Sequence, residues 1–202
     1  MSQLPLMVEM TGLCAVVIGG GKVACKRAKA LVENGAIVTI ISPHLTDSLQ
    51  ELVSLGKIKW LDKRFEASDA REAFLLVVAT DDEEVNERVL QVAAHIPLIN
   101  DATNAERGNI TFPGVFRKGK LTISVSTAGA SPGLTSSILS KIREHYDDYG
   151  PYVDFLYECR QQIKHSSMDE GEKRRLLREI VEERYKDEEE QRQFKEAIDR
   201  RW

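Results

Sequence analysis

The sequence predicts an α/β fold in which helices cover both faces of a parallel β-sheet. Apolar runs at residues 14–18, 37–41 and 74–79 are each followed by an amphipathic helical pattern, and shorter runs lie at 58–61 and 97–99. Strands that are buried on both faces appear as continuous apolar runs, and their alternation with helices indicates parallel pairing. This pattern occupies the first half of the chain.

The first strand runs directly into three glycines and the start of a helix, in the stretch CAVVIGGGKVA at residues 14–24. Gly19 is expected to make the turn, Gly21 lets the backbone approach a phosphate, and Ala24 stands where a small residue packs the helix against the strand. The helix N-terminus adds unpaired N–H groups and a partial positive charge. The pattern predicts a Rossmann-like dinucleotide-binding site, with a plain glycine-rich turn as the alternative interpretation.

The other parts of the predicted cofactor site follow from the topology. Ligands of open parallel sheets bind beyond the carboxyl ends of the strands, so Gly19–Gly21, Ser42–His44 and Thr80–Asp82 are expected to line one crevice. The position that usually carries an acidic residue for the ribose 2′-hydroxyl is Ser42, and no arginine follows directly to bind a 2′-phosphate. The Ser42 hydroxyl can serve the ribose of NAD, which is favoured over NADP.

Composition restricts the class of protein. The 202 residues are 42% hydrophobic and 30% charged, as in globular proteins, and the net charge of −4 argues against a nucleic-acid partner. No apolar run approaches the roughly 18 residues of a membrane span, and the N-terminus lacks the features of a signal peptide. Three cysteines imply no disulfide framework, so a cytoplasmic protein is expected, and four histidines without ligand spacing predict no metal site.

The composition changes after about residue 113. Residues 114–127 predict a β-hairpin whose second strand places Thr122, Ser124 and Ser126 on one face. Ser131 is the expected N-cap of the helix that follows, and the remainder of the chain is helical and rich in Glu, Lys and Arg.

Three segments together resemble the precorrin-2 dehydrogenase family, which includes the N-terminal part of siroheme synthases. They are LPLMVEMTGLCAVVIGGGKVACKRAKALVENGA at 4–36, VVATDDEEVNERV at 77–89, and INDATN with FPGVFRKGKLTISVSTAGASPGL at 99–134. The resemblance implies a chain that oxidises precorrin-2 to sirohydrochlorin, with NAD as the hydride acceptor, in siroheme or cobalamin biosynthesis. It also implies a homodimer, and a division into a Rossmann-like NAD-binding domain (1–113), a small α+β dimerisation and substrate unit (114–146) and a helical C-terminal part (147–202).

The resemblance carries site residues onto matching positions. The implied cofactor-binding residues are Gly19, Gly21, Lys22, Val23, Ser42, Pro43, His44, Thr80 and Asp81. The implied substrate-binding residues are Ser124, Ser126 and Thr127, with Arg117 and Lys120 as candidates for a basic rim that meets the carboxylates of the tetrapyrrole. For each single basic residue, an ordinary solvated charge is the alternative.

One departure from the family concerns its proposed catalytic aspartate. That position falls on Thr103 or Asn104 here, and Asp101, the nearest carboxylate, is two or three residues out of register. The candidate catalytic residues are therefore Asn104, Thr103 and Ser124. Because aromatisation favours the loss of a hydride and a proton from the substrate, holding the substrate near the nicotinamide can supply much of the rate acceleration. Metal insertion must remove two pyrrole protons, so little or no chelatase activity is expected, and the product is handed to a separate chelatase.

Two other functions stay open at this stage. One is a bifunctional dehydrogenase and ferrochelatase, which a substitution of Asp101 is expected to reveal through a large loss. The other is an NAD(H)-sensing regulatory module that uses the charged C-terminal helices as a partner-binding arm. Such a module needs no substrate pocket, and it leaves the SVSTAGASP segment at 124–132 without a use.

Overall fold

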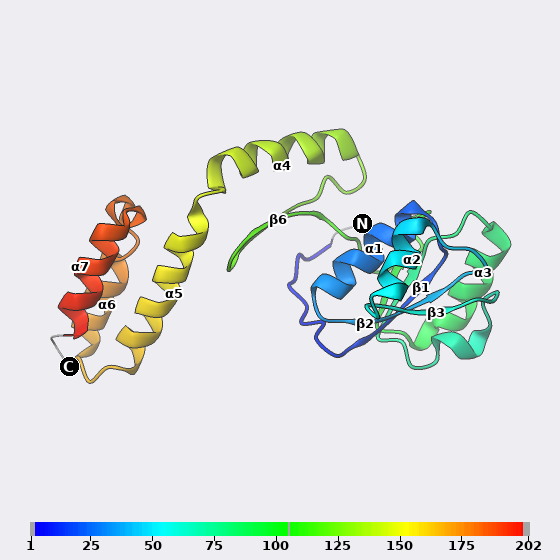
Figure 1. The fold of residues 1–202 in the computed structure, drawn as a ribbon, viewed down its shortest axis with the longest axis horizontal. Coiled ribbons are helices and arrows are strands. Elements are labelled where there is room, and N and C mark those ends of the chain that lie inside the picture. The colour runs from blue at the N-terminus through cyan, green and yellow to red at the C-terminus, as the bar shows by residue number, and fades with distance from the viewer. Residues whose placement is uncertain (1–2, 105, 200–202) are drawn as a thin grey trace. The chain divides into compact units, whose positions relative to one another are not determined.

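The computed structural model describes residues 3–104 and 106–199. The chain divides into two compact units, Met1–Phe112 and Pro113–Trp202 (Figure 1). Each unit has its own hydrophobic core. The expected further boundary at residue 146, inside the second unit, stays a prediction.

The first unit contains a five-stranded parallel sheet. Its strands lie in the order β3 (Lys59–Leu61), β2 (Ile37–Ile41), β1 (Cys14–Ile18), β4 (Leu75–Val78) and β5 (Leu98–Asp101). The order reverses between β1 and β4, which is the point where Rossmann-type sheets open a crevice for a ligand. The predicted parallel sheet is confirmed, but the last strand extends to Asp101 rather than Ile99, so Asp101 is a buried strand residue.

Helices cover both faces of this sheet, as predicted. The helices α1 (Lys22–Glu33) and α2 (Asp47–Ser54) pack on one face, and α3 (Glu83–Val92) with the 3₁₀ turns η1 (Ala67–Ala70) and η2 (Ala93–His95) packs on the other. Successive residues of β1 alternate between the two cores, because successive side chains of a strand point to opposite faces. Both faces are therefore apolar, and polar groups gather where the strands end.

The second unit begins with an antiparallel hairpin of β6 (Gly114–Lys118) and β7 (Leu121–Val125), as predicted. The helix α4 (Pro132–Tyr146) packs on β6 so closely that a Cβ at Gly114 would stand 2.5 Å from Leu139 Cδ1. Ser131 caps α4, because its hydroxyl accepts a hydrogen bond from the Leu134 N–H at 3.1 Å. This cap confirms the predicted start of the helix.

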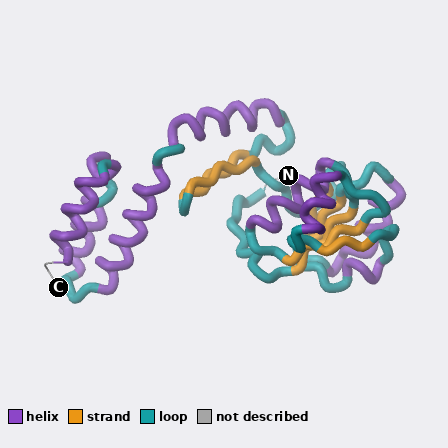
Figure 2. Tube along the Cα trace, viewed as in Figure 1, coloured by secondary structure: helices purple, strands orange, loops and turns teal. Residues whose placement is uncertain are grey.

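The rest of the second unit is helical (Figure 2). It consists of α5 (Tyr149–His165), α6 (Glu170–Glu179), the 3₁₀ turn η3 (Glu183–Lys186) and α7 (Glu188–Asp199). The core of these helices contains the rings of Phe155, Tyr185 and Phe194, whose centroids lie 5.1 to 6.0 Å apart. Within the described ranges, no helix has both the length and the apolar character to span a bilayer.

Candidate functional site

A pocket of about 760 Å³ opens at the carboxyl ends of the strands in the first unit. Its volume is in the range of sites for drug-sized ligands and cofactors. Residues that follow β1, β2, β3, β4 and β5 all contribute to it. The lining consists of Ile18 to Val23, Ile41 to Thr46, Lys63 to Phe65, Ala79 to Asp82, Val85, Ala102 and Thr103.

The glycine turn forms the floor between β1 and α1. Gly19 has φ of 120°, which a residue with a side chain rarely adopts, and a Cβ there would overlap the carbonyl of Ala79. A Cβ on Gly20 would overlap the carbonyl oxygen of His44, whereas one on Gly21 would meet nothing within 4 Å. Gly21 is also the N-cap of α1, and no side chain caps the helix there. The open space therefore lies in front of uncapped N–H groups, as a bound phosphate requires.

The ends of β2 and β3 form one side of the pocket. The Ser42 hydroxyl donates to the carbonyl of His44 at 2.7 Å, and Trp60 Nε1 donates to the carbonyl of Ser42 at 2.8 Å. Both bonds fix the chain that follows β2. Thr46 also lines the pocket, and its buried Oγ1 lacks a hydrogen-bond partner within the described part of the chain. An unpaired hydroxyl beside an open phosphate cradle fits a polar ligand such as a dinucleotide.

Two cations at the end of β3 were missed in the sequence. Lys63 and Arg64 line the pocket because β3 pairs in parallel with β2, which brings the residues after Leu61 beside those after Ile41. Lys63 is paired with Glu66 at 3.1 Å and Asp69 at 3.0 Å, whereas Arg64 is exposed and has no ion pair within residues 3–104 and 106–199. The short apolar run at 58–61 predicted a strand, but it did not show that this strand pairs with β2.

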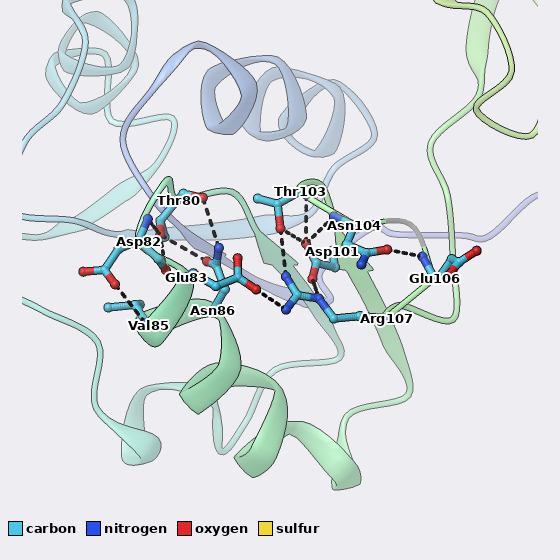
Figure 3. A network of polar contacts seen from close by, with 10 residues as sticks. All are labelled: Thr80, Asp82, Glu83, Val85, Asn86, Asp101, Thr103, Asn104, Glu106 and Arg107. Carbon is cyan, nitrogen blue, oxygen red and sulfur yellow. Dashed lines mark hydrogen bonds and ion pairs between the residues drawn. The ribbon is translucent and has the colours of Figure 1, made fainter.

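The end of β4 is tied to α3 by side chains. Thr80 Oγ1 lies 3.1 Å from Asn86 Oδ1, and Asn86 Nδ2 donates to the carbonyl of Thr80 at 3.2 Å (Figure 3). Asp82 caps α3 by accepting from the Val85 N–H at 3.1 Å. Asn86 is buried, so this loop is fixed to the helix below it.

The end of β5 is organised around Asp101, whose side chain is fully buried. One carboxylate oxygen accepts from the Thr103 hydroxyl at 2.6 Å, the Thr103 N–H at 2.8 Å and the Asn104 N–H at 3.0 Å. Burial by itself raises the pKa of Asp101, but these hydrogen bonds and the charge of Arg107 outweigh it and hold the pKa below its usual value. Asp101 is therefore ionised and fully engaged, which makes it a poor proton acceptor.

Arg107 joins this loop to the neighbouring one. Its Nε donates to the second carboxylate oxygen of Asp101 at 2.9 Å, its Nη2 donates to Thr103 Oγ1 at 3.1 Å, and its Nη1 pairs with Glu83 at 2.5 Å. Glu83 is the first residue of α3, so the ends of β4 and β5 are linked through one guanidinium (Figure 3).

The structure brings together part of the expected site. All nine expected cofactor residues line the one pocket, namely Gly19, Gly21, Lys22, Val23, Ser42, Pro43, His44, Thr80 and Asp81, and Thr103 lines it as well. Asn104 is not among the lining residues, and its Oδ1 accepts from the Glu106 N–H at 3.0 Å. The catalytic and binding roles of all these residues stay predictions.

The expected substrate residues belong to the second unit. Ser124 and Ser126 are exposed on β7 and just after it, and Arg117 is exposed on β6. Thr127 Oγ1 accepts from the Ser131 N–H at 3.2 Å, so it holds the loop before α4. Lys120 is paired with Asp154 at 2.7 Å.

Among the described residues, no group of three or more His, Cys, Asp and Glu side chains is arranged to hold a metal ion.

A parallel sheet of order β3-β2-β1-β4-β5, with a glycine-lined phosphate cradle at its switch point, defines a Rossmann-type dinucleotide-binding protein. Residues 6–114 accordingly match a family model described as NAD(P)-binding, and residues 149–194 match the SirC C-terminal domain. The cofactor class predicted from the glycine pattern is confirmed.

Relatives specify the family further. Precorrin-2 dehydrogenase of Priestia megaterium is 35% identical over 90% of this chain and 90% of its own length. Precorrin-2 dehydrogenase of Bacillus subtilis (strain 168) is 33% identical over 79% of this chain and 99% of its own length. The solved structure of SirC, precorrin-2 dehydrogenase, superposes with a TM-score of 0.86 at 32% identity and covers 98% of this chain and 100% of that one. The chain belongs to the precorrin-2 dehydrogenase family, which confirms the resemblance found in the sequence.

Proposed function

We propose that this chain oxidises precorrin-2 to sirohydrochlorin, with NAD as the hydride acceptor. The observation that carries the proposal is the pocket at the switch point, with an open cradle in front of α1, in a chain of the precorrin-2 dehydrogenase family. When bound, NAD supplies the nicotinamide carbon that accepts the hydride. The product belongs to siroheme and cobalamin biosynthesis.

Each side of the pocket has a part in this proposal. The N–H groups at Gly21, Lys22 and Val23 hold the pyrophosphate at the N-terminus of α1. The chain after β2, at Ser42–His44, holds the adenosine, and Thr80 and Asp81 lie on the nicotinamide side with Thr103. This division follows the two mononucleotide-binding halves of a Rossmann-type sheet, one on each side of the switch point.

The remaining assigned residues serve the substrate. Ser124, Ser126 and Thr127 contact the tetrapyrrole, Arg117 and Lys120 meet its carboxylates, and Asn104 orients a pyrrole N–H. Oxidation leads to a more fully conjugated ring system, so holding the substrate carbon near the nicotinamide supplies much of the rate. Asp101 lies two or three residues from the position of the family aspartate, and its engagement in four hydrogen bonds supports a dehydrogenase with little chelatase activity.

The assembly and the place of action are part of the proposal. The helix α4 has no buried residue, and Val115 and Leu134 are 46% and 53% exposed, which supports a homodimer formed through the hairpin and α4. Light scattering is expected to give twice the mass of the chain. The dimer acts in the cytoplasm and releases sirohydrochlorin to a separate chelatase.

The test is anaerobic incubation of the purified protein with precorrin-2 and NAD, followed by visible spectroscopy. The sirohydrochlorin spectrum should appear in step with NADH. Cobalt or iron added afterwards should enter the product no faster than it does without protein. NADH binding without any turnover of precorrin-2 would favour the NAD(H)-sensing module instead.

A further inference from the structure

We infer that Thr103 is the hydrogen-bond acceptor for the carboxamide N–H of the nicotinamide, and that Asp101 and Arg107 are the positioning residues that hold its hydroxyl for this purpose. The inference deepens the proposed function and rests on it for the side of the pocket that nicotinamide occupies. It gives a role to the hydrogen bonds that join Thr103 to Asp101 and Arg107, to which the proposed function assigns none.

The hydrogen bonds of Thr103 decide what its hydroxyl can offer a ligand. A hydroxyl has one proton to donate and two lone pairs that accept. The proton points to Asp101 Oδ1 at 2.6 Å, and one lone pair accepts from Arg107 Nη2 at 3.1 Å. Because Asp101 is held ionised, it keeps that proton on the side away from a ligand. The remaining lone pair of Thr103 can only accept, so the matching ligand group is an N–H or O–H donor.

The network also fixes where this acceptor stands. Asp101 is fully buried on β5, and Arg107 is three-quarters buried with its guanidinium bonded to Asp101, Thr103 and Glu83. Glu83 opens α3, so Thr103 is connected through Arg107 to this helix as well as to Asp101 on β5 (Figure 3). A guanidinium that makes several charge-assisted hydrogen bonds leaves the Thr103 hydroxyl few alternative positions, because the donors of the guanidinium lie in one rigid plane.

The position of Thr103 in the pocket indicates which group of the cofactor donates the hydrogen bond. Thr103 lines the same pocket as Gly19 and Thr80, on the β4–β5 side of the switch point. The adenosine half of a dinucleotide binds on the β2 side, where the ribose-reading position lies, so the nicotinamide half falls on the β4–β5 side. The carboxamide is the group of the nicotinamide ring that carries N–H donors. A fixed acceptor there sets the rotation of the ring, and thereby which of its faces meets the substrate.

The experiment compares the binding of NADH with that of reduced 3-acetylpyridine adenine dinucleotide, in which a methyl group replaces the carboxamide nitrogen. Dissociation constants are measured by fluorescence for the wild-type protein, Thr103→Val, Arg107→Lys and the double variant. Valine keeps the shape of threonine and the backbone bond to Asp101, so Thr103→Val is expected to fold. Arg88→Lys is the matched control, because Arg88 is an exposed arginine of α3 that does not line the pocket.

The expected result is a preference of the wild-type protein for NADH of about tenfold, the size of one neutral hydrogen bond whose loss leaves a partner unpaired. Thr103→Val should reduce this preference to about twofold or less, and Arg107→Lys should reduce it in part. Because Arg107 acts through Thr103, Arg107→Lys should change nothing further in the Thr103→Val background. Arg88→Lys should retain the wild-type preference.

Three results would overturn the inference: a wild-type protein without the preference, a Thr103→Val variant that keeps it, or additive effects of the two substitutions. In each case oxidation of precorrin-2 by the wild-type protein would leave the proposed function standing. Failure of NADH to bind the wild-type protein would overturn the inference and the proposed cofactor together.

Discussion

The two sides of the pocket are built differently. On the β4–β5 side, the buried side chains of Asn86 and Asp101 and the guanidinium of Arg107 link two loops and a helix through hydrogen bonds. On the β2–β3 side, one hydrogen bond from Trp60 Nε1 to the Ser42 carbonyl joins the two strand ends, the Ser42 hydroxyl bonds within its own loop, and Arg64 is exposed. A reacting ring needs one orientation, whereas an adenosine needs only to be retained. The degree of cross-linking on each side matches these two demands.

Removal of Asp101 should have the largest effect, because it dismantles the cross-linked side. Asp101→Ala leaves the Thr103 and Asn104 N–H groups and the Arg107 guanidinium without their acceptor. We expect a loss of about 3 kcal/mol in the free energy of unfolding, the magnitude seen when one partner of a buried ion pair is removed. Asp62→Ala, an exposed aspartate near the β2–β3 side, is the control and should change stability by less than about 0.5 kcal/mol. Calorimetry of both variants measures the difference. Equal losses of stability in the two variants would contradict the view that the β4–β5 side is the more strongly cross-linked one.

Because Asp101 holds its loop in place, a loss of activity on its substitution has two possible causes. A loss of activity on substitution of Asp101 was expected from the sequence to reveal a catalytic base or a chelatase. Because Asp101 holds the backbone of Thr103 and Asn104, its removal disturbs the loop whether or not the residue takes part in chemistry. Thr103→Val is the cleaner substitution, since it keeps the loop.

The stability that Asp101 provides should depend on pH in a defined direction. Its pKa is lower in the folded chain than in the unfolded one, so its contribution is complete above the unfolded value and is lost as the pH falls through the folded value. The unfolding free energies of wild type and Asp101→Asn should therefore differ at about pH 7, and the difference should be smaller at about pH 3, which lies below the unfolded pKa of about 3.9. Denaturant titrations at both pH values check this, and a difference that grows toward acid pH would contradict the assignment.

Alanine substitutions at Gly20 and Gly21, which lie between the two sides of the pocket, should affect different properties: the first the stability of the fold, and the second the binding of NADH. A methyl group on Gly20 overlaps the His44 carbonyl and stands 2.9 Å from the Ser42 hydroxyl, so Gly20→Ala should destabilise the first unit by about 2 kcal/mol. A methyl group on Gly21 meets no protein atom and projects into open space. Gly21→Ala should fold as the wild type does and bind NADH about tenfold more weakly, because the methyl occupies the phosphate cradle. Thermal unfolding and fluorescence titration of both variants are the measurements. Unchanged NADH affinity in Gly21→Ala would mean that the pyrophosphate does not bind in front of Gly21.

The sequence allowed the sheet, its flanking helices and the cofactor loops to be predicted, because they follow from local patterns. The apolar runs and the glycine turn need no knowledge of distant residues. Lys63 and Arg64 were missed because their place depends on the pairing of β3 with β2, which apolar character alone does not reveal. The role of Asp101 was missed for a similar reason: the predicted strand ends at Ile99, so the sequence did not predict that the carboxylate is buried.

The smallest effect is expected on the β2–β3 side. Arg64 is exposed at the edge of the pocket, so its attraction for the phosphates of the cofactor acts through solvent. Arg64→Ala should weaken NADH binding by no more than about threefold, and the difference should disappear near about 1 M salt, where the screening length is short. Lys57→Ala removes an exposed cation outside the pocket and should have no effect. A loss of about tenfold or more that persists in salt would mean that Arg64 makes a direct, desolvated contact, and that the adenosine side is as specific as the nicotinamide side.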